Sequence, residues 1–358
     1  MLTTKHHDGF CLWNTSQTDY NSMNTPCGKD LVKMYADAFR REGIRIGFYY
    51  SLLDWHHPEY TLDPRHPMYG NSSFTEKNQN RRMSIYAEYM RRQITELLSE
   101  YGEIDMMFFD FSIRDYEKNI MIKGRREWES EELIKLVRRL QPEMLVNDRL
   151  DLDEYEWGWD FTTPEQIAVR SVPLKNGKPV PWEACHTFSG SWGYFRDEQS
   201  WKSSEQLIKL LVDTVSKGGN LLLNVGPTAR GDFDERANDR LEKIGAWMKK
   251  NSAAIYNCTC APDIFTVPPD CRLTYNPEDK RLFIHIFSYP PTGELYIEGS
   301  GTAGIKYAQF LHDGSEIQFG ARKPWQMRME NITGIVKSFK LPVLKPAPEV
   351  PVIECFLE

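Results

Sequence analysis

The strongest constraint on the fold is a run of four consecutive apolar residues, Met106–Phe109, within the stretch IDMMFFD. A strand with one face in water alternates apolar and polar residues, whereas a strand covered on both faces is apolar throughout. A second stretch of this kind, NLLLNV, occupies residues 220–225. Both are typical of a parallel sheet wrapped by helices, which means an α/β barrel or a doubly wound sheet.

Short apolar runs and helical patterns alternate along most of the chain. Strands are predicted within residues 2–7, 44–51, 104–110, 143–148 and 219–226. Helices are predicted within residues 30–43, 82–102, 130–141 and 203–218. In the first helix the predicted buried face consists of Met34, Tyr35, Ala38 and Phe39. In the second it consists of Ile94, Leu97, Leu98 and Tyr101, and the two helices are expected to stop at Gly43 and Gly102.

The barrel is the favoured form of this α/β region. No strand is followed by a glycine-rich phosphate turn of the GxGxxG or GxxxxGK(S/T) kind, so a nucleotide-binding sheet loses its main support. After about residue 262 the pattern changes to proline-rich turns and short alternating runs such as RLFIHIFSY, without an amphipathic helix. The sequence therefore predicts a (β/α)8-like barrel over residues 1–261 and a small antiparallel β-sandwich over residues 262–358.

Charge and composition narrow the classes of partner. The formal net charge of −7 and the lack of a long basic block argue against nucleic acid or an anionic membrane. No stretch reaches the roughly 18 apolar residues of a membrane span, and the N-terminus lacks the pattern of a signal peptide. The seven cysteines show neither zinc-ribbon nor CxxC spacing, so buried free thiols are expected. No cofactor is expected, and the compartment is not indicated.

Polar residues that close apolar strands are the candidates for chemistry, because the carboxyl ends of barrel strands form the active face. They are His6, His7, Asp8, Tyr49, Tyr50, Asp110, Asn147, Asp148, Arg149, Glu183 and Asn224. A carboxylate at the rim of a barrel can act as a nucleophile or as an electrostatic stabiliser of a bound sugar. The alternative for Asp110 is a strand-end carboxylate that caps the next turn.

The triplet formed by His6, His7 and Asp8 is open to two interpretations. Clusters of His and Asp ligate Zn or Mn, but adjacent strand residues point to opposite faces, and no partner ligands stand at a defined spacing. Hydrogen bonding to substrate hydroxyls is therefore favoured over a metal-dependent hydrolase. Ordinary packing is the alternative for the aromatic residues near the strand ends, which are Trp13, Tyr49, Trp55 and Trp192. For the stretch TTPEQ the alternative is the start of a helix or a turn.

Seven stretches in order resemble the family 29 glycoside hydrolases, the α-L-fucosidases, over essentially the whole chain. They are LTTKHHDGFCLW, YYSLLDW, YGEIDMMFFD, NDR, WDFTTPE, WEACHTFSGSWGY and SKGGNLLLNVGP. The resemblance implies a retaining exo-α-L-fucosidase without a cofactor, with Asp110 as nucleophile and Glu165 as acid/base. Glu183 is the second choice for the acid/base. The implied fucose pocket consists of His6, His7, Trp13, Tyr49, Arg149 and Trp192.

Two departures from the family pattern affect these expectations. Phe111 follows Asp110 where the family usually has a small residue, so the pocket floor is expected to be crowded. The first ten residues, MLTTKHHDGF, resemble the third barrel strand of the family, so the barrel is expected to be incomplete at the N-terminus. The alternative function is accordingly a non-catalytic or vestigial fucose-binding protein.

The resemblance also implies a partner and a compartment. The partner would be a fucosylated oligosaccharide or glycoconjugate, and the full-length parent would be periplasmic, secreted or lysosomal. The fucose linkage and the oligomeric state are not indicated.

Overall fold

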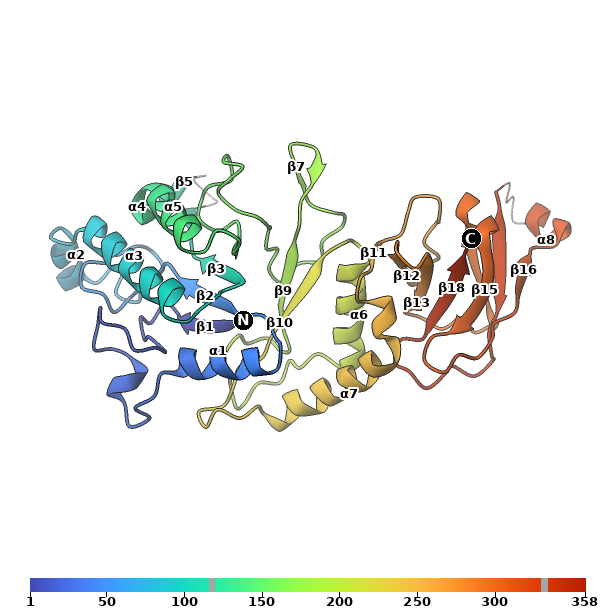
Figure 1. Cartoon of the computed structure of the whole chain (residues 1–358), viewed down its shortest axis with the longest axis horizontal. Coiled ribbons are helices and arrows are strands. Elements are labelled where there is room, and N and C mark those ends of the chain that lie inside the picture. The colour runs from blue at the N-terminus through green and yellow to red at the C-terminus, as the bar shows by residue number, and fades with distance from the viewer. Residues whose placement is uncertain (116–119, 330–333) are drawn as a thin grey trace. The chain divides into compact units, whose positions relative to one another are not determined.

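The computed structural model describes residues 1–115, 120–329 and 334–358. The chain forms two compact units, Met1–Thr163 and Pro164–Glu358 (Figure 1).

The first unit is built on a parallel sheet with the strand order β1-β2-β3-β6. These strands are β1 (Leu2–Lys5), β2 (Gly47–Ser51), β3 (Met106–Asp110) and β6 (Leu145–Val146). The register pairs Ser51 with Asp110, so the carboxyl ends of β2 and β3 lie level with each other. Phe108 and Phe109 in β3 are both buried although their side chains point to opposite faces, which confirms the prediction from consecutive apolar residues.

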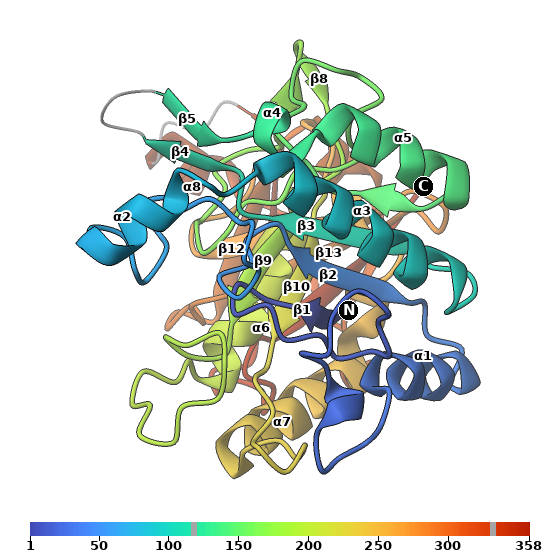
Figure 2. The same cartoon turned by 90° about the vertical axis from the view of Figure 1, so that its left-hand side faces the viewer.

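Helices cover this sheet. Helices α3 (Met83–Ser99) and α5 (Ser130–Leu140) lie side by side, and α1 (Leu31–Arg41) lies beside β1 (Figure 2). Smaller elements of this unit are η1 (Ser22–Asn24), α2 (Ser72–Asn78), β4 (Ile113–Asp115), β5 (Ile120–Lys123) and α4 (Arg125–Trp128).

The predicted buried face is right for α3 and right only in part for α1, where Tyr35 packs against the core. Ile94, Leu97, Leu98 and Tyr101 are all buried. In α1, however, Met34 is 51% exposed and Phe39 is 37% exposed, whereas Val32 and Ala36 are buried. The periodicity of α1 offers two overlapping apolar faces, and the face with the smaller side chains lets the helix approach the sheet closely.

The second unit begins with a parallel pair of strands, β9 (Glu183–Thr187) and β10 (Asn220–Asn224). The leucines of β10 are half-buried rather than buried, so the prediction of full burial was wrong for this strand. In the part of the chain that the structure describes, β10 pairs with β9 alone. The connecting elements are β7 (Leu174–Lys175), β8 (Lys178–Pro179), α6 (Ser204–Val215), α7 (Glu235–Asn251) and η2 (Ser252–Ala254), of which α7 was not predicted.

The rest of the second unit is an antiparallel β-sandwich, as predicted. One sheet has the order β11-β12-β13-β18-β15 and the other the order β14-β17-β16. The bounds of the first sheet are β11 (Thr259–Cys260), β12 (Cys271–Asn276), β13 (Arg281–Ile286), β18 (Val352–Leu357) and β15 (Ile305–Phe310). Those of the second are β14 (Glu294–Glu298), β17 (Val336–Lys340) and β16 (Phe319–Ala321), with the short helices η3 (Ser300–Gly304) and α8 (Pro324–Met329).

The two sheets share one core, and helices cover the outer face of the larger sheet. Leu273 and Ile284 of the first sheet pack with Ile297 and Phe339 of the second. On the other face of the larger sheet, Phe283 and Val352 pack against residues of α6 and α7, which are Ile208, Val212 and Trp247.

The closed form of the α/β region stays a prediction, because its parallel strands form a four-stranded sheet in the first unit and a two-stranded sheet in the second. The boundary at residues 261 and 262 is likewise a prediction. Among the described residues, no helix has both the length and the apolar composition that crossing a membrane requires.

Candidate active site

Asp110 is the last residue of β3, and its carboxylate accepts three hydrogen bonds. Tyr49 Oη donates to Oδ2 at 2.7 Å, and Arg149 Nη1 donates to Oδ1 at 2.7 Å. The backbone N–H of Phe111 donates to Oδ1 at 2.9 Å. The apolar strand can therefore end on a half-buried charge, because a cation and two dipoles replace the lost water.

Arg149 is held in place from its far side. Its Nε donates to Thr163 Oγ1 at 2.9 Å, and its Nη2 donates to the carbonyl oxygen of Thr163 at 2.9 Å. Thr163 Oγ1 in turn donates to Asp148 Oδ1 at 2.8 Å, and the guanidinium lies over the ring of Phe108 at 4.9 Å from its centroid. Because these contacts fix the planar guanidinium of Arg149, its Nη1 is presented to Asp110 in one orientation.

The hydrogen bonds of His6 fix which ring nitrogen carries the proton. His6 Nδ1 accepts from the backbone N–H of His7 at 2.8 Å, so neutral His6 must carry its proton on Nε2. That Nε2 lies 3.2 Å from Tyr49 Oη, whose own proton points to Asp110. Burial lowers the pKa of His6, which favours the neutral ring. His6, Tyr49 and Asp110 thus form a directed chain in which each group donates to the next.

Stacked aromatic rings lie beside this hydrogen-bond chain. The imidazole of His7 stacks on the indole of Trp55, with centroids 3.9 Å apart, and burial lowers the pKa of His7. His7 Nδ1 and Trp55 Nε1 are buried and have no hydrogen-bond partner among the described residues. Because protein atoms enclose both, neither atom is open to a ligand in this conformation.

Phe111 has a backbone conformation that its side chain disfavours. Its φ is 79°, in the left-handed region that costs a bulky residue about 1–3 kcal/mol. Its ring meets the His6 ring edge to face at 5.5 Å between centroids. The crowding beside Asp110 that the sequence predicts is thus present, because the strained Phe111 packs against the ring of His6.

The described residues offer no set of ligands for the metal ion of a metal-dependent hydrolase. Across residues 1–115, 120–329 and 334–358, no group of three or more His, Cys, Asp or Glu side chains could hold a metal ion. The rings of His6 and His7 are nearly perpendicular, at 88°, and Nδ1 of His6 already accepts from the backbone.

The second unit carries both candidates for the acid/base. Glu165 is exposed and lies beside β9, where the N–H of Cys185 donates to Pro164 and the N–H of Gln166 donates back to Cys185, both at 3.0 Å. These bonds pair the segment with β9. No helix begins at these residues, so the helix-start interpretation of TTPEQ was wrong, whereas the start of a turn stays a prediction. Glu183 is the first residue of β9, at the amino end of the strand, and burial raises its pKa to about 7. The carboxyl end of β9 is at Thr187, so strand direction favours Glu165.

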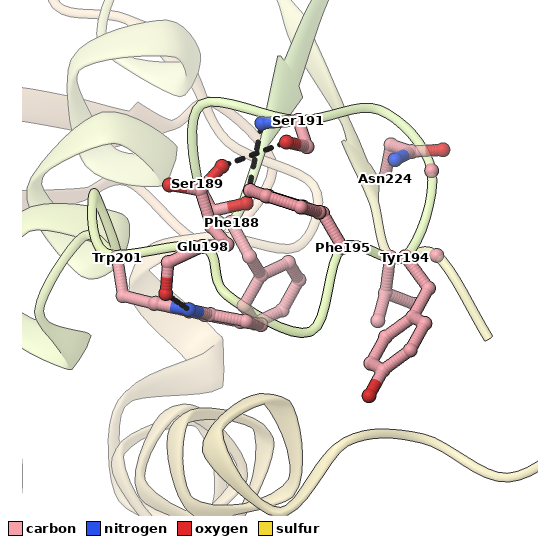
Figure 3. Close-up of a pocket in the computed structure, with 11 residues that line it drawn as sticks. Phe188, Ser189, Ser191, Tyr194, Phe195, Glu198, Trp201 and Asn224 are labelled. Atoms are coloured by element: carbon pink, nitrogen blue, oxygen red, sulfur yellow. Dashed lines mark hydrogen bonds between the residues drawn. The ribbon is translucent and has the colours of Figure 1, made fainter. Parts of the chain in front are cut away.

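Trp192 lies in the loop between β9 and α6. It is 42% exposed, and its carbonyl oxygen accepts a hydrogen bond of 2.6 Å from Asn224 Nδ2. A cavity of about 20 Å³ lies under this loop, which is room for one water molecule and too little for a sugar (Figure 3). Hydrogen bonds from Ser200 and Ser191 order the loop and lower the pKa of Glu198 to about 2. The loop therefore presents the indole of Trp192 to solvent from an ordered base.

Trp13 does not face a site. Its side chain is fully buried in the core of the first unit, and its Nε1 donates to Glu96 Oε2 at 3.0 Å. The structure corrects its expected contact with substrate to a packing role. Sequence reasoning gave Thr163 no role in the site and left Trp55 open between packing and function, although both lie in the quoted stretches WDFTTPE and YYSLLDW.

Comparisons with known proteins identify the family of the chain. The sequence model of the family described as Alpha-L-fucosidase matches residues 1–253. The plasma α-L-fucosidase of Rattus norvegicus is 29% identical over 336 residues, which cover 90% of this chain and 67% of that protein.

Two solved structures are similar over almost the whole chain. α-L-Fucosidase isoenzyme 1 from Paenibacillus thiaminolyticus is 38% identical with a TM-score of 0.88, covering 99% of this chain and 82% of that one. The α-fucosidase of Thermotoga maritima, solved with a mechanism-based inhibitor, is 29% identical with a TM-score of 0.74, covering 99% and 74%. The chain spans 51% to 67% of the length of curated relatives such as the human tissue and rat plasma proteins. The chain belongs to the α-L-fucosidase family of glycoside hydrolases.

Proposed function

We propose that the chain is a retaining exo-α-L-fucosidase, which removes terminal α-L-fucose from oligosaccharides or glycoconjugates by double displacement. The observation that carries the proposal is the carboxylate of Asp110, presented at the carboxyl end of β3 by Tyr49 and Arg149. Family membership supports the substrate class.

In the first step an Asp110 oxygen attacks the anomeric carbon while the bond to the leaving oxygen breaks. Glu165 gives its proton to that oxygen, and fucose remains as an ester on Asp110. In the second step Glu165 takes a proton from water, the water oxygen attacks the anomeric carbon, and Asp110 leaves as a carboxylate. The two carboxyl groups must lie roughly 5–5.5 Å apart for this chemistry.

The remaining polar groups would bind the sugar. His6 and His7 would contact ring hydroxyls. Trp192 would cover the apolar edge that carries the C6 methyl group. The Thermotoga maritima relative was solved with a mechanism-based inhibitor. This supports a mechanism that such an inhibitor can trap.

We also propose that the parallel strands belong to a (β/α)8-like barrel over residues 1–261, followed by the sandwich over residues 262–358. The high similarity to the Paenibacillus thiaminolyticus structure supports one common architecture. That the rat relative is a plasma protein supports export from the cell.

The test is hydrolysis of 4-nitrophenyl α-L-fucoside by the parent chain and by Asp110→Gly. The variant should lose activity by on the order of a thousandfold or more, because no nucleophile remains. Sodium azide should restore turnover of Asp110→Gly and yield β-L-fucosyl azide, since azide fits the space left by the carboxylate. Equal hydrolysis by both proteins would refute the proposal.

Two further measurements complete the test. Glu165→Ala should slow substrates with poor leaving groups more than it slows the nitrophenyl substrate, because poor leaving groups need the proton most. Calorimetry with L-fucose separates the alternative function, because binding by a parent chain that never hydrolyses a fucoside would identify a fucose-binding protein.

A further inference from the structure

We propose that Lys5 and Asp54 form a buried clamp that positions the turn from His6 to Gly9, and through it the hydrogen-bond chain from His6 to Asp110. The clamp makes Lys5 and Asp54 positioning residues for fucoside hydrolysis, and in that respect it rests on the proposed function.

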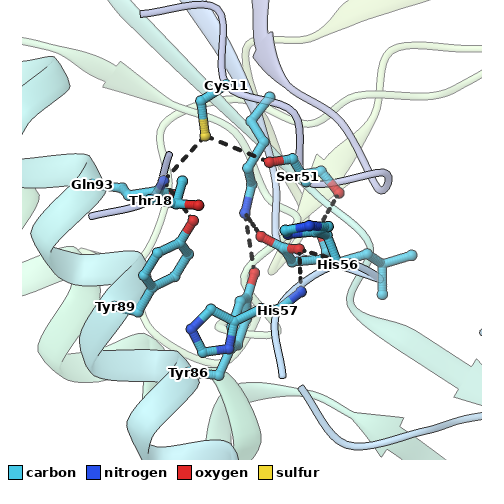
Figure 4. Close-up of polar contacts among 12 residues, drawn as sticks. Cys11, Thr18, Ser51, His56, His57, Tyr86, Tyr89 and Gln93 are labelled. Carbon is cyan, nitrogen blue, oxygen red and sulfur yellow. Dashed lines mark hydrogen bonds and ion pairs between the residues drawn. The ribbon is translucent and has the colours of Figure 1, made fainter. Parts of the chain in front are cut away.

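Lys5 is the last residue of β1, and its side chain has no exposed surface. Its Nζ lies 3.0 Å from Asp54 Oδ2 and 3.2 Å from Tyr86 Oη, and it stands 4.4 Å from the ring centroid of Tyr50. Figure 4 labels Tyr86, His56 and His57 among the residues that these polar contacts join. Burying a cation is costly, and a pair of this kind is weak support for stability alone. A role in fixing local geometry accounts for its presence.

Asp54 is the centre of the clamp. Its side chain is 2% exposed, and while Oδ2 accepts from Lys5, Oδ1 accepts from the backbone N–H groups of His56 and His57 at 3.1 and 2.9 Å. These bonds tie the carboxylate to the loop that follows β2. The carboxylate is thus held from two elements, the end of β1 and the loop after β2.

Gly9 packs against the same carboxylate from the other end of the turn. A Cβ at this position would stand 2.3 Å from Asp54 Oδ1, and the φ of Gly9 is +79°. The N–H of Gly9 donates to the carbonyl oxygen of His6 at 3.0 Å and closes the turn. Only glycine fits this close approach and this conformation. Asp54 therefore contacts the residue before the turn, Lys5, and the residue that ends it, Gly9.

The clamped turn carries the two histidines of the candidate site. The N–H of Trp55, next to Asp54, donates to the carbonyl oxygen of His7 at 2.8 Å. The N–H of His7 in turn fixes the tautomer of His6, and His6 reaches Asp110 through Tyr49. A displacement of the turn would misalign the carboxylate, and misplacement by about 1 Å can cost about a hundredfold in rate.

The chain contains a matched control pair. Lys123 Nζ lies 2.6 Å from Asp63 Oδ2, with side chains 3% and 1% exposed. Lys123 also stands over a tyrosine ring, 4.3 Å from the centroid of Tyr60, and Tyr60 Oη donates to Asp63. Lys123 Nζ also donates a hydrogen bond to the carbonyl oxygen of Thr61. The contacts of this pair are of the same kind as those of Lys5 and Asp54. Among the described residues, the pair does not contact the turn from His6 to Gly9.

The test compares the double variants Lys5→Met/Asp54→Asn and Lys123→Met/Asp63→Asn. Each removes a charge pair without leaving a buried charge alone. In the clamp variant the new amide oxygen could still accept from the backbone N–H groups of His56 and His57. On 4-nitrophenyl α-L-fucoside, the clamp variant should lose about 10- to 100-fold in kcat with KM changed less than about threefold. The control variant should keep kcat within about twofold.

Nitrogen-15 NMR of the imidazole rings gives a readout that does not depend on activity. The parent should show His6, assigned with His6→Gln, as a single tautomer protonated on Nε2. The clamp variant should show mixed tautomers. A clamp variant that keeps both the parent kcat and the single His6 tautomer would overturn the inference, and so would a control variant that loses as much kcat.

The outcomes separate the clamp from the proposed function. A parent chain that hydrolyses no fucoside would defeat the function, while the tautomer of His6 would still test the clamp. If Lys5→Met/Asp54→Asn does not fold, Gly9→Ala takes its place, because it leaves both charges and drives a methyl group against Asp54 Oδ1. Gly9→Ala should then show the same loss of kcat and mixed tautomers, and parent values of both would refute the clamp.

Discussion

Replacing Tyr49 with phenylalanine tests the hydrogen-bond chain at its centre. The substitution removes only the hydroxyl, which donates to Asp110 at 2.7 Å and lies 3.2 Å from His6 Nε2. The ring keeps its stacked neighbours, His6 at 5.3 Å and Phe108 at 5.7 Å between centroids. Tyr49→Phe should therefore fold like the parent.

The expected cost follows from the charge on the acceptor. A hydrogen bond to a charged group contributes about 1.5–3 kcal/mol, and each 1.4 kcal/mol corresponds to about tenfold in rate. Asp110 would keep two of its three donors, Arg149 and the N–H of Phe111. We expect kcat/KM to fall by about 10- to 100-fold.

The assay is steady-state hydrolysis of 4-nitrophenyl α-L-fucoside, with circular dichroism to check folding. Tyr35→Phe is the matched control, because its hydroxyl makes only a long contact of 3.5 Å to the carbonyl oxygen of Gly47. The control should retain parent activity. A folded Tyr49→Phe variant with kcat/KM within twofold of the parent would show that the chain does not orient the carboxylate.

Three further predictions concern titration. Burial raises the pKa of Glu183 to about 7, so the folded state holds its proton more tightly and the carboxyl group destabilises the fold as pH rises from 4.5 to 7. Glu183→Gln should keep kcat within about twofold and gain up to roughly 3 kcal/mol of unfolding free energy at pH 8. A large loss of kcat would instead support Glu183 as the acid/base. Burial lowers the pKa of His6, so the acidic limb of the pH profile of kcat/KM that depends on His6 should lie below pH 6.5. An acidic limb above pH 6.5 that His6→Gln shifts would contradict the tautomer assignment. His285 is fully buried, and burial lowers its pKa from 6.5 to about 3, so its contribution to stability should be lost as pH falls below 6.5. Between pH 7 and 5.5 this loss should reach roughly 1 kcal/mol by urea denaturation, and an equal loss in His285→Gln would show that another group is responsible.

Strand-end reasoning located the polar cluster of the first unit but not its connections. Asp110, Tyr49 and Arg149 were all predicted from their places after apolar strands, and all three meet. The hydrogen bond from His7 to His6 Nδ1, which fixes the direction of the chain, depends on a turn geometry that periodicity does not encode. The positive φ of Phe111 is equally invisible in a sequence, because bulky residues seldom adopt it.

Burial was harder to predict than element type. The resemblance placed Trp13 in the fucose pocket, yet it lies in the core, where Glu96, far away in the sequence, supplies a partner for its indole N–H. Glu165 and Glu183 were hard to rank because both lie in motif-like stretches. The bounds of β9 favour Glu165, since they place Glu183 at the amino end of a strand whose carboxyl end is the one expected to carry chemistry.

The most direct test of the account is the site of covalent labelling. Incubation of the parent chain with 2-deoxy-2-fluoro-α-L-fucosyl fluoride should trap one fluorofucosyl group per chain, because the fluorine slows hydrolysis of the ester. Peptide mass spectrometry should place that group on Asp110. A label on any other carboxylate, or steady hydrolysis of the reagent by Asp110→Gly, would contradict the assignment of Asp110 as the nucleophile.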